Sequence, residues 1–191
     1  QMKLSKKYFQ QEDVVFLAKD LLGKLLITET AGIKTGGIIT ETEAYSEIEK
    51  GCHAYNKRKT ERTKIMFEAG GLSYVYFCYG MHHLFNIVTG KKDTAQAVLI
   101  RAIEPTIGIE EILLRRKREK LDKNISNGPG KVCQALGISK EHYGVSLTDT
   151  KIWLEKTSLK ITEEQILATP RIGIDYAVED KLLPWRFVLK I

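Results

Sequence analysis

The segment Glu41-Thr42-Glu43-Ala44-Tyr45 places two carboxylates and a phenol at alternate positions. Successive side chains of a β-strand point to opposite faces, so Glu41, Glu43 and Tyr45 would share one face of a strand. Two carboxylates beside an aromatic ring suit acid–base chemistry better than they suit a hydrophobic core. For this segment alone a solvent-exposed hairpin face is the simpler interpretation, because exposed glutamates need no special explanation.

The residues around this segment predict a helix followed by a hairpin. Asp13 can cap a helix with one apolar side, and Gly23 stands where such a helix would end. Residues 24–30 predict a strand, Ala31-Gly32 a turn, and residues 34–45 the returning strand that carries the acidic face. The helix is expected to be a packing element.

A long polar loop and a second hairpin are predicted next. Residues 46–64 are charged and poor in apolar side chains, and long loops inside compact domains are often functional. Residues 72–79 alternate aromatic and smaller side chains, Gly80 interrupts the run, and residues 82–89 resume it. The turn of this hairpin is expected near residues 79–81.

Residues 97–103 predict a nearly continuous apolar strand that is interrupted by Arg101. An arginine in so apolar a strand needs a carboxylate partner, because an unpaired buried charge is costly. Glu41 and Glu104 are both candidates for this partner.

Two helices are predicted beyond this strand. Residues 109–123 have one apolar stripe and a basic flank at 115–118, which is typical of a solvated helix face. The segment Gly128-Pro129-Gly130-Lys131 precedes a second helical pattern, whose free backbone amides could receive a phosphate with Lys131 beside them. A plain loop-to-helix junction is the simpler interpretation of this motif in isolation. Residues 144–191 predict short strands and turns, without a linker.

The overall composition bounds the class of protein. The chain has 191 residues, 43% hydrophobic and 28% charged, which suits one domain spanning residues 1–191. A net charge of +6 favours a polyanionic partner without proving one. The widely separated cysteines form no C-x-x-C pair, so we expect a reduced, cytoplasmic chain without a structural metal. No apolar run approaches the roughly 18 residues of a membrane span, and no signal-type segment follows the lysine-rich start, so we expect no membrane association.

A set of segments occurs in one order along nearly the whole chain. They are residues 37–45, Tyr74 to Met81, Val98 to Pro105, Gly128 to Lys131, and Arg171-Ile172-Gly173-Ile174. This order resembles the alkyladenine (3-methyladenine or methylpurine) DNA glycosylase family. The resemblance implies a base-excision repair enzyme whose partner is double-stranded DNA containing damaged purines. It also implies an α+β domain with a curved, mostly antiparallel β-sheet, surrounding helices and a protruding hairpin that wedges into DNA. No cofactor is expected, a monomer would suit DNA scanning, and in a bacterium the enzyme would associate with the nucleoid.

The resemblance assigns the catalytic positions. Glu43 matches the family's general base, which polarises the water that attacks the sugar C1′, and Arg101 matches the residue that helps to hold this water. Tyr79 matches the side chain that enters the minor groove and fills the vacated stack. No lysine stands at a matching nucleophile position, so we expect hydrolysis without strand cleavage.

The resemblance also assigns the binding positions. Those implied to hold the extruded base are Tyr45, His53, Tyr76, Asn86, Ile172 and Gly173, and those implied to bind phosphate are Gly130 and Lys131. An electron-poor alkylated purine should be attracted to electron-rich rings. Taken alone, Tyr76 would be read as a core aromatic, His53 as a loop histidine, and Asn86 as a partner of a neighbouring backbone group.

The loop before the pocket histidine departs from the family pattern. The family's Asp-Pro-small-Ser run is Glu49-Lys50-Gly51-Cys52 here, and its Arg-Asn is Arg62-Thr63. These changes leave open the conformation of the loop and the preferred lesion among 3-methyladenine, 7-methylguanine, hypoxanthine and ethenoadenine.

Two other classes of function compete with this one. A catalytically silent nucleic-acid-binding module could use the same scaffold, although it would not need a carboxylate facing a duplex. A hydrolase of free nucleosides or damaged nucleotides would use Glu43, but it would need neither a wedge at Tyr79 nor a basic surface.

Overall fold

The computed structural model describes residues 2–190, so both ends of the predicted domain lie outside the described residues. Eight strands form one sheet: β1 (Leu25–Thr30), β2 (Ile33–Ser46), β3 (Ser73–Cys78), β4 (His82–Val88), β5 (Gln96–Ile107), β6 (Ile152–Glu155), β7 (Ile166–Thr169) and β8 (Arg186–Leu189). The helices are α1 (Lys6–Phe9), α2 (Val14–Asp20), α3 (Ile109–Arg116) and α4 (Pro129–Leu136), with 3-10 turns η1 (Tyr55–Lys57), η2 (Lys64–Phe67), η3 (Lys140–His142), η4 (Glu163–Gln165) and η5 (Asp175–Leu182).

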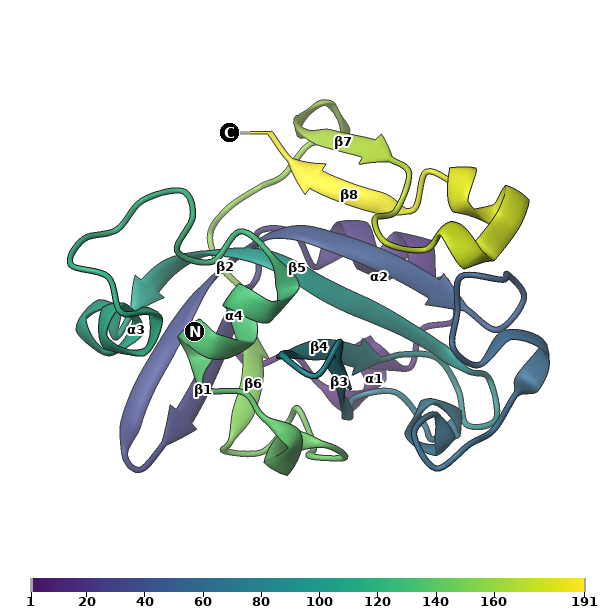
Figure 1. Ribbon diagram of the computed structural model, residues 1–191, viewed down its shortest axis with the longest axis horizontal. Helices are drawn as coiled ribbons and strands as arrows, with labels where there is room; N and C mark the ends of the chain where they lie inside the picture. The colour runs from purple at the N-terminus through teal and green to yellow at the C-terminus, as the bar shows by residue number, and fades with distance from the viewer. Residues whose placement is uncertain (1, 191) are drawn as a thin grey trace.

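The long strand β2 organises the sheet. It lies beside β5 over most of its length, while its other edge pairs first with β1 and then, at residues 41–43, with β8 (Figure 1). All of these pairings are antiparallel. Neighbouring strands of the sheet follow the order β3-β4-β5-β2-β1-β6, and β7 and β8 lie off this path. The sheet is curved and does not close, and helices pack around it, so the predicted α+β fold is confirmed. The segment of β2 that carries the acidic residues therefore lies between two neighbouring strands, β5 and β8, and not at an edge of the sheet.

Two β-bulges interrupt the β2–β5 ladder beside this acidic face. Ile39 pairs with Ile103 and Glu41 pairs with Ala102, so Thr40 is an extra residue on β2. The next pair of the ladder joins residues 42 and 100, which leaves Arg101 as an extra residue on β5. Bulges bend a strand and redirect its side chains. Here they bring Arg101 to the acidic face.

The opposite face of β2 is covered by α2. Asp13 caps this helix by accepting a hydrogen bond from the Phe16 N–H at 3.0 Å. The Thr42 hydroxyl donates to the Ala18 carbonyl at 2.8 Å, which joins the helix to the strand. α2 ends at Asp20, before the predicted end at Gly23, and the turn that follows the helix includes Gly23 with φ of +86°. The buried face of α2 thus fixes the strand that carries the candidate site.

The β3–β4 hairpin forms as predicted. Tyr79 and Gly80 both have left-handed φ angles, 54° and 65°, and the Met81 N–H donates to the Cys78 carbonyl at 3.1 Å. The Tyr79 side chain is 86% exposed at the tip of the hairpin. α4 packs closely against the start of β4, next to the turn of the hairpin, since a Cβ on Gly130 would lie 2.8 Å from the His82 ring.

The predicted helix over residues 109–123 is too long. α3 ends at Arg116, because Lys117 has a left-handed φ of 54° and the Arg118 N–H donates back to the Leu113 carbonyl at 2.9 Å. The prediction of a solvated basic flank is also wrong for two residues. Arg115 donates to the Ala135 carbonyl at 3.1 Å, and Arg116 donates to the Ile125 carbonyl at 2.8 Å. These guanidinium groups hold α3 to α4 and to the loop between them.

Within residues 2–190, no helix has the length and apolar character that a membrane crossing requires.

A strained residue lies in η5, the turn that follows the Arg171-Ile172-Gly173-Ile174 segment. Val178 has φ of 55° and ψ of −120°, a conformation that β-branched residues avoid. We predict that Val178→Gly raises the free energy of unfolding by about 1 kcal/mol, because the strain relieved exceeds the entropy gained by the unfolded chain. Urea denaturation measures the change. Val178→Ala is the control, since it keeps a Cβ in the same conformation, and a less stable glycine variant would contradict the assignment of strain.

Candidate active site

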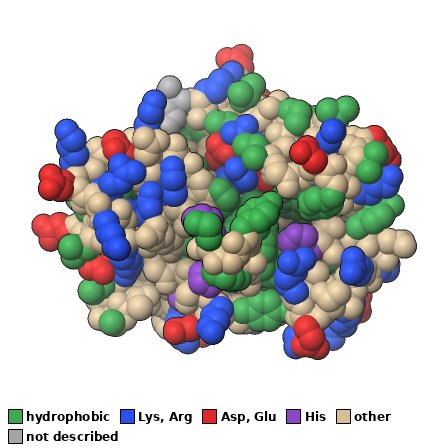
Figure 2. All heavy atoms as spheres, viewed as in Figure 1, with side chains coloured by type: hydrophobic (Ala, Val, Ile, Leu, Met, Phe, Trp, Pro, Cys, Tyr) green, Lys and Arg blue, Asp and Glu red, His purple; other side chains and the backbone are tan. Residues whose placement is uncertain are grey.

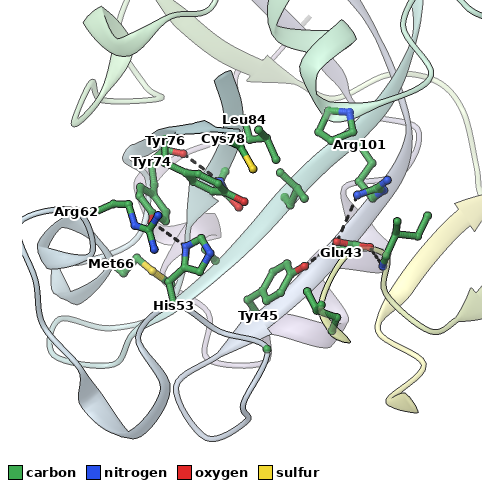
Figure 3. A pocket seen from close by; sticks show the side chains of 18 of the residues that line it. Glu43, Tyr45, His53, Arg62, Met66, Tyr74, Tyr76, Cys78, Leu84 and Arg101 are labelled. Atoms are coloured by element: carbon green, nitrogen blue, oxygen red, sulfur yellow. Dashed lines mark hydrogen bonds and ion pairs between the residues drawn. The ribbon is translucent and has the colours of Figure 1, made fainter. Parts of the chain in front are cut away.

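A cavity of about 380 Å³ opens between β2, β5, the β3–β4 hairpin and the segment after Arg171 (Figure 3). In the space-filling view the face is hollowed beside hydrophobic side chains, with Lys and Arg side chains gathered on both sides of it (Figure 2). All predicted catalytic, base-binding and wedge residues line this cavity. They are Glu43, Tyr45, His53, Tyr76, Tyr79, Asn86, Arg101, Ile172 and Gly173.

Glu43 is the buried acid of this cavity, with 0% exposure. Its Oε1 accepts a hydrogen bond from the Tyr45 hydroxyl at 2.7 Å, and its Oε2 accepts one from the Ile172 N–H at 2.8 Å. The interpretation of this segment as a solvent-exposed hairpin face is therefore wrong for Glu43, because its carboxylate is buried against Tyr45, Arg101 and the segment at Ile172. Burial raises the pKa of Glu43 above its ordinary value, while Arg101, the Ile172 N–H and the Tyr45 hydroxyl oppose the rise.

Arg101 lies between two carboxylates. Its Nε donates to Glu41 Oε2 at 2.9 Å, and its Nη1 lies 3.6 Å from Glu43 Oε1. Arg186 on β8 donates to the same Glu41 oxygen at 2.9 Å. Of the two partners considered from sequence, Glu41 is the correct one, whereas Glu104 is exposed. Four charged side chains are thus linked to one another: Arg186, Glu41, Arg101 and Glu43.

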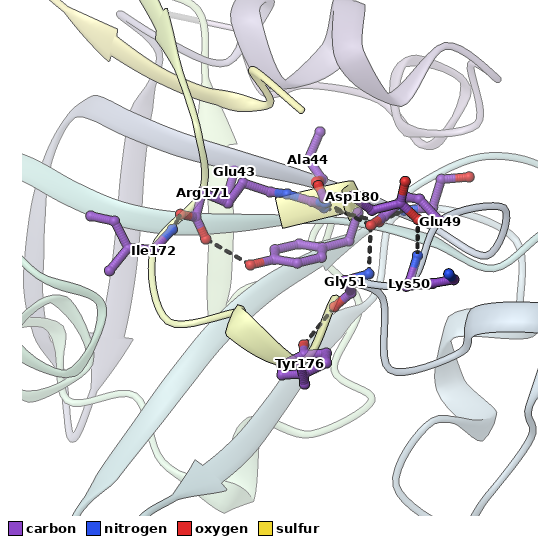
Figure 4. Close-up of polar contacts among 11 residues, drawn as sticks. Glu43, Ala44, Glu49, Lys50, Gly51, Arg171, Ile172, Tyr176 and Asp180 are labelled. Atoms are coloured by element: carbon purple, nitrogen blue, oxygen red, sulfur yellow. Dashed lines mark hydrogen bonds and ion pairs between the residues drawn. The ribbon is translucent and has the colours of Figure 1, made fainter. Parts of the chain in front are cut away.

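A second ion pair, which the sequence reasoning missed, joins Arg171 to Glu49 (Figure 4). The Arg171 guanidinium donates to both oxygens of Glu49, at 2.6 and 2.9 Å, and to the Ala44 carbonyl at 2.9 Å. The same guanidinium lies 4.7 Å from the centroid of the Tyr45 ring. It thereby fixes the ring and the backbone that presents the Ile172 N–H to Glu43.

Glu49 also orders the loop that departs from the family pattern. Its carboxylate accepts hydrogen bonds from the Ser46 N–H at 3.0 Å and the Gly51 N–H at 2.7 Å. The Tyr176 hydroxyl donates to the Gly51 carbonyl at 2.6 Å from the facing turn. The only sequence signal for this arrangement was the presence of charged residues in an otherwise irregular loop.

The aromatic side of the cavity is built around His53. Its Nδ1 lies 3.0 Å from the Tyr74 hydroxyl, and its ring meets the Tyr76 ring edge to face at a centroid distance of 4.8 Å. Burial, with a smaller contribution from Arg62, lowers the pKa of His53 to about 4. The imidazole is therefore neutral at physiological pH. Asn86 donates to the Tyr74 carbonyl at 3.2 Å, which is the structural role considered for it from sequence.

The predicted phosphate-binding residues lie at the start of α4, next to the cavity. Gly128 stands at the N-cap position of this helix and has no side chain. The backbone amides of the first turn therefore receive no hydrogen bond from a capping side chain. Lys131 donates to the Asn127 side chain at 2.9 Å. Pro129 lines the cavity, whereas Gly130 and Lys131 do not.

Between residues 2 and 190, no cluster of His, Cys, Asp and Glu side chains has an arrangement that could hold a metal ion, and Cys52, Cys78 and Cys133 are free thiols.

Comparison with known proteins identifies the family. The family model described as methylpurine-DNA glycosylase (MPG) matches residues 8–191. The chain belongs to the methylpurine-DNA glycosylase family. Among its relatives, a protein of Chlamydia felis named "Putative 3-methyladenine DNA glycosylase" is 50% identical over 190 residues, which cover 98% of this chain and 96% of the relative. A protein of Bacillus thuringiensis with the same name is 48% identical over 189 residues, which cover 94% of this chain and 92% of the relative.

Membership of the methylpurine-DNA glycosylase family confirms the resemblance drawn from the ordered segments. The enzyme is a 3-methyladenine DNA glycosylase, an N-glycosyl hydrolase of DNA repair. The match extends over the hairpin, the cavity and the C-terminal strands alike.

The buried ion pair of this glycosylase is open to a direct test. We predict that Glu49→Gln lowers the free energy of unfolding by about 3 kcal/mol, because it leaves the Arg171 charge buried without its partner. Denaturant unfolding measures the loss. Glu179→Gln is the matched control, because its pair with Lys50 lies at the surface, with side chains 64% and 36% exposed, and its loss should not alter stability measurably. Equal stability of the two variants would contradict a structural role for the Glu49–Arg171 pair.

Proposed function

We propose that this glycosylase excises alkylated and deaminated purines from duplex DNA by activating a water molecule with Glu43, and that it leaves an abasic site. The observation that carries this proposal is a fully buried carboxylate, held by two hydrogen bonds beside Arg101, at one side of a cavity lined with aromatic rings. Such a carboxylate faces the place where a positive charge develops on the sugar.

The reaction balances as a hydrolysis. The oxygen of water forms a bond to C1′ while the bond from C1′ to the purine nitrogen breaks, and the purine takes the bonding electron pair. Glu43 accepts the proton that the water loses. Because the Tyr45 hydroxyl and the Ile172 N–H each engage one oxygen of Glu43, the orientation of the carboxylate is fixed before the substrate arrives. Arg101 contributes donors on the same side of the cavity, where they can hold the water.

The aromatic rings suit a purine that has left the helix. Tyr45, His53 and Tyr76 come from separate segments and line one cavity, so a flat base can stack among them. A base in a duplex must first be rotated outward, which costs a few kcal/mol of stacking. The exposed ring of Tyr79, at the tip of a tight turn, is suited to fill the space that the base vacates.

Phosphate binding is proposed at the start of α4. The amides of its first turn and Lys131 lie beside the cavity, where they can bind the strand that carries the lesion. The net charge of +6 supports a salt-sensitive association with DNA. We assign no phosphate contact to Arg115 and Arg116 on the basic flank of α3, because these two side chains bind backbone carbonyls.

The absence of strand cleavage is part of the same proposal. The cavity lining within residues 2–190 contains no lysine, and a Schiff base with the sugar requires an amine nucleophile. We further propose that the enzyme acts as a monomer on chromosomal DNA in the cytoplasm, at the nucleoid in a bacterium, because one chain supplies every side of the cavity.

Glu43→Gln tests the base. We predict that excision of methylpurines falls by about 10²- to 10⁴-fold, because the amide cannot accept a proton from water, while affinity for lesion DNA is retained. Chromatography of the bases released from methylated duplex DNA measures excision, and a gel-shift assay measures binding. Glu104→Gln removes an exposed carboxylate from β5 and should leave excision unchanged. If Glu43→Gln keeps most of its activity, Glu43 is not the base.

The pH dependence of excision tests the electrostatics. Only the ionised form of Glu43 can act as a base, so the rate should fall on the acid side of a pKa that lies above the ordinary value for glutamate. Arg101 favours the ionised form and lowers this pKa. We therefore predict that Arg101→Gln moves the acid limb of the pH–rate profile to higher pH, in addition to slowing the reaction. An acid limb that stays in place, or moves to lower pH, would show that Arg101 does not act on this carboxylate.

A further inference from the structure

Arg62 is a charged residue that lines the cavity, and it has no role in the proposed reaction. The centre of its guanidinium lies 5.6 Å from the centroid of the Tyr76 ring, and its side chain contributes to the cavity lining. Figure 3 shows it on the same side of the cavity as His53 and Tyr74, across from Glu43. The charge therefore lies beside the rings that would enclose the extruded base.

This charge lacks the compensation that the other arginines of the site receive. Arg101 lies 2.9 Å from a Glu41 oxygen, and Arg171 is paired with both oxygens of Glu49. In the part of the chain from residue 2 to residue 190, no carboxylate lies within 4.0 Å of the Arg62 guanidinium. The nearby Glu61 carboxylate is instead paired with Lys64 at 2.9 Å. The aromatic end of the cavity thus has an excess positive charge.

The charge acts on the groups that would surround the base. It opposes protonation of His53, which has a pKa of about 4 mainly because of burial and secondarily because of Arg62. A purine stacked against the same rings would experience the same field. A lesion with a fixed positive charge, such as 7-methylguanine, would be repelled, whereas a neutral lesion such as hypoxanthine would not be, and its carbonyl oxygen could accept a hydrogen bond from the guanidinium.

We propose that Arg62 sets the preference of this glycosylase among lesions of different charge, disfavouring cationic purines relative to neutral ones. The inference rests on the proposed function and deepens it, because it concerns which damaged purines the same cavity accepts. The attraction of electron-rich rings for a cationic base is thereby offset at Tyr76, where a cation is already in contact with the ring. Because Arg62 is exposed, solvent screens the effect, and we expect a change of about threefold to tenfold.

The test compares two lesions in one enzyme. Single-turnover excision is measured for duplexes that contain either one 7-methylguanine or one hypoxanthine, with wild type, Arg62→Gln and Arg62→Lys at the same salt concentration. The ratio of the 7-methylguanine rate to the hypoxanthine rate should rise by about threefold to tenfold in Arg62→Gln. It should stay close to the wild-type ratio in Arg62→Lys, which keeps the charge.

Lys59→Gln is the matched control. Lys59 lies on the same loop, and its ammonium is 5.5 Å from the centroid of the Phe67 ring, but it does not line the cavity. Its removal should leave the ratio unchanged.

The outcomes separate the possible roles of Arg62. An unchanged or lower ratio in Arg62→Gln overturns the proposal. A parallel loss of both rates, with weaker salt dependence of binding, also overturns it and assigns Arg62 to a phosphate contact. If wild type excises neither lesion, the proposed function itself fails and this inference fails with it.

Discussion

The burial of a carboxylate is the constraint on which the rest of this site depends. Glu43 is withdrawn completely from solvent, and an isolated carboxylate in such a place would simply take up a proton. The protein opposes this with Arg101 and two hydrogen-bond donors, the Tyr45 hydroxyl and the Ile172 N–H. Burial outweighs these three groups, so the carboxyl has a raised pKa, and the two hydrogen bonds fix its orientation. Both properties suit the general base that we propose. The environment that we propose for excision thus also costs stability, because it keeps a carboxylate buried.

The fold supplies this environment through departures from regular structure. The bulges at Thr40 and Arg101 alter the β2–β5 register beside the acidic face. Beyond the ladder, Val178 adopts a strained conformation in the turn that follows the segment covering Glu43. Strain persists only where the surroundings determine it, and here the Arg171–Glu49 pair fixes the start of that segment while Tyr176 ties it to the facing loop. Of these residues, Arg101 and Tyr176 line the cavity.

Local patterns were sufficient to predict several elements. The alternation of Glu41, Glu43 and Tyr45, the capping of α2 by Asp13 and the turn at Tyr79 each depend on neighbouring residues, and all three are present. Each of the ordered family segments contributes at least one residue to the lining of one cavity, although the roles of these residues in the reaction stay predictions.

Features that depend on distant contacts could not be predicted in this way. The Glu49–Arg171 pair joins residues 122 positions apart, and although both residues lie in segments that the sequence singles out, no local pattern shows that they pair. Glu43 is likewise bound by the Ile172 N–H, which lies 129 positions further along the chain. The end of α3 was missed because Lys117 adopts a left-handed conformation, although the helical pattern continues beyond it.

A direct titration of Glu43 tests the central claim. Carbon-13 NMR of the glutamate side-chain carboxyl groups, recorded against pH for wild type and Glu43→Gln, would show the titration of Glu43 as the transition that the variant lacks. The structure predicts that this carboxyl titrates above the ordinary pKa of a glutamate and returns toward it when the protein unfolds. A transition at or below the ordinary value would contradict the account, because burial would not then be the dominant influence on the residue proposed as the base.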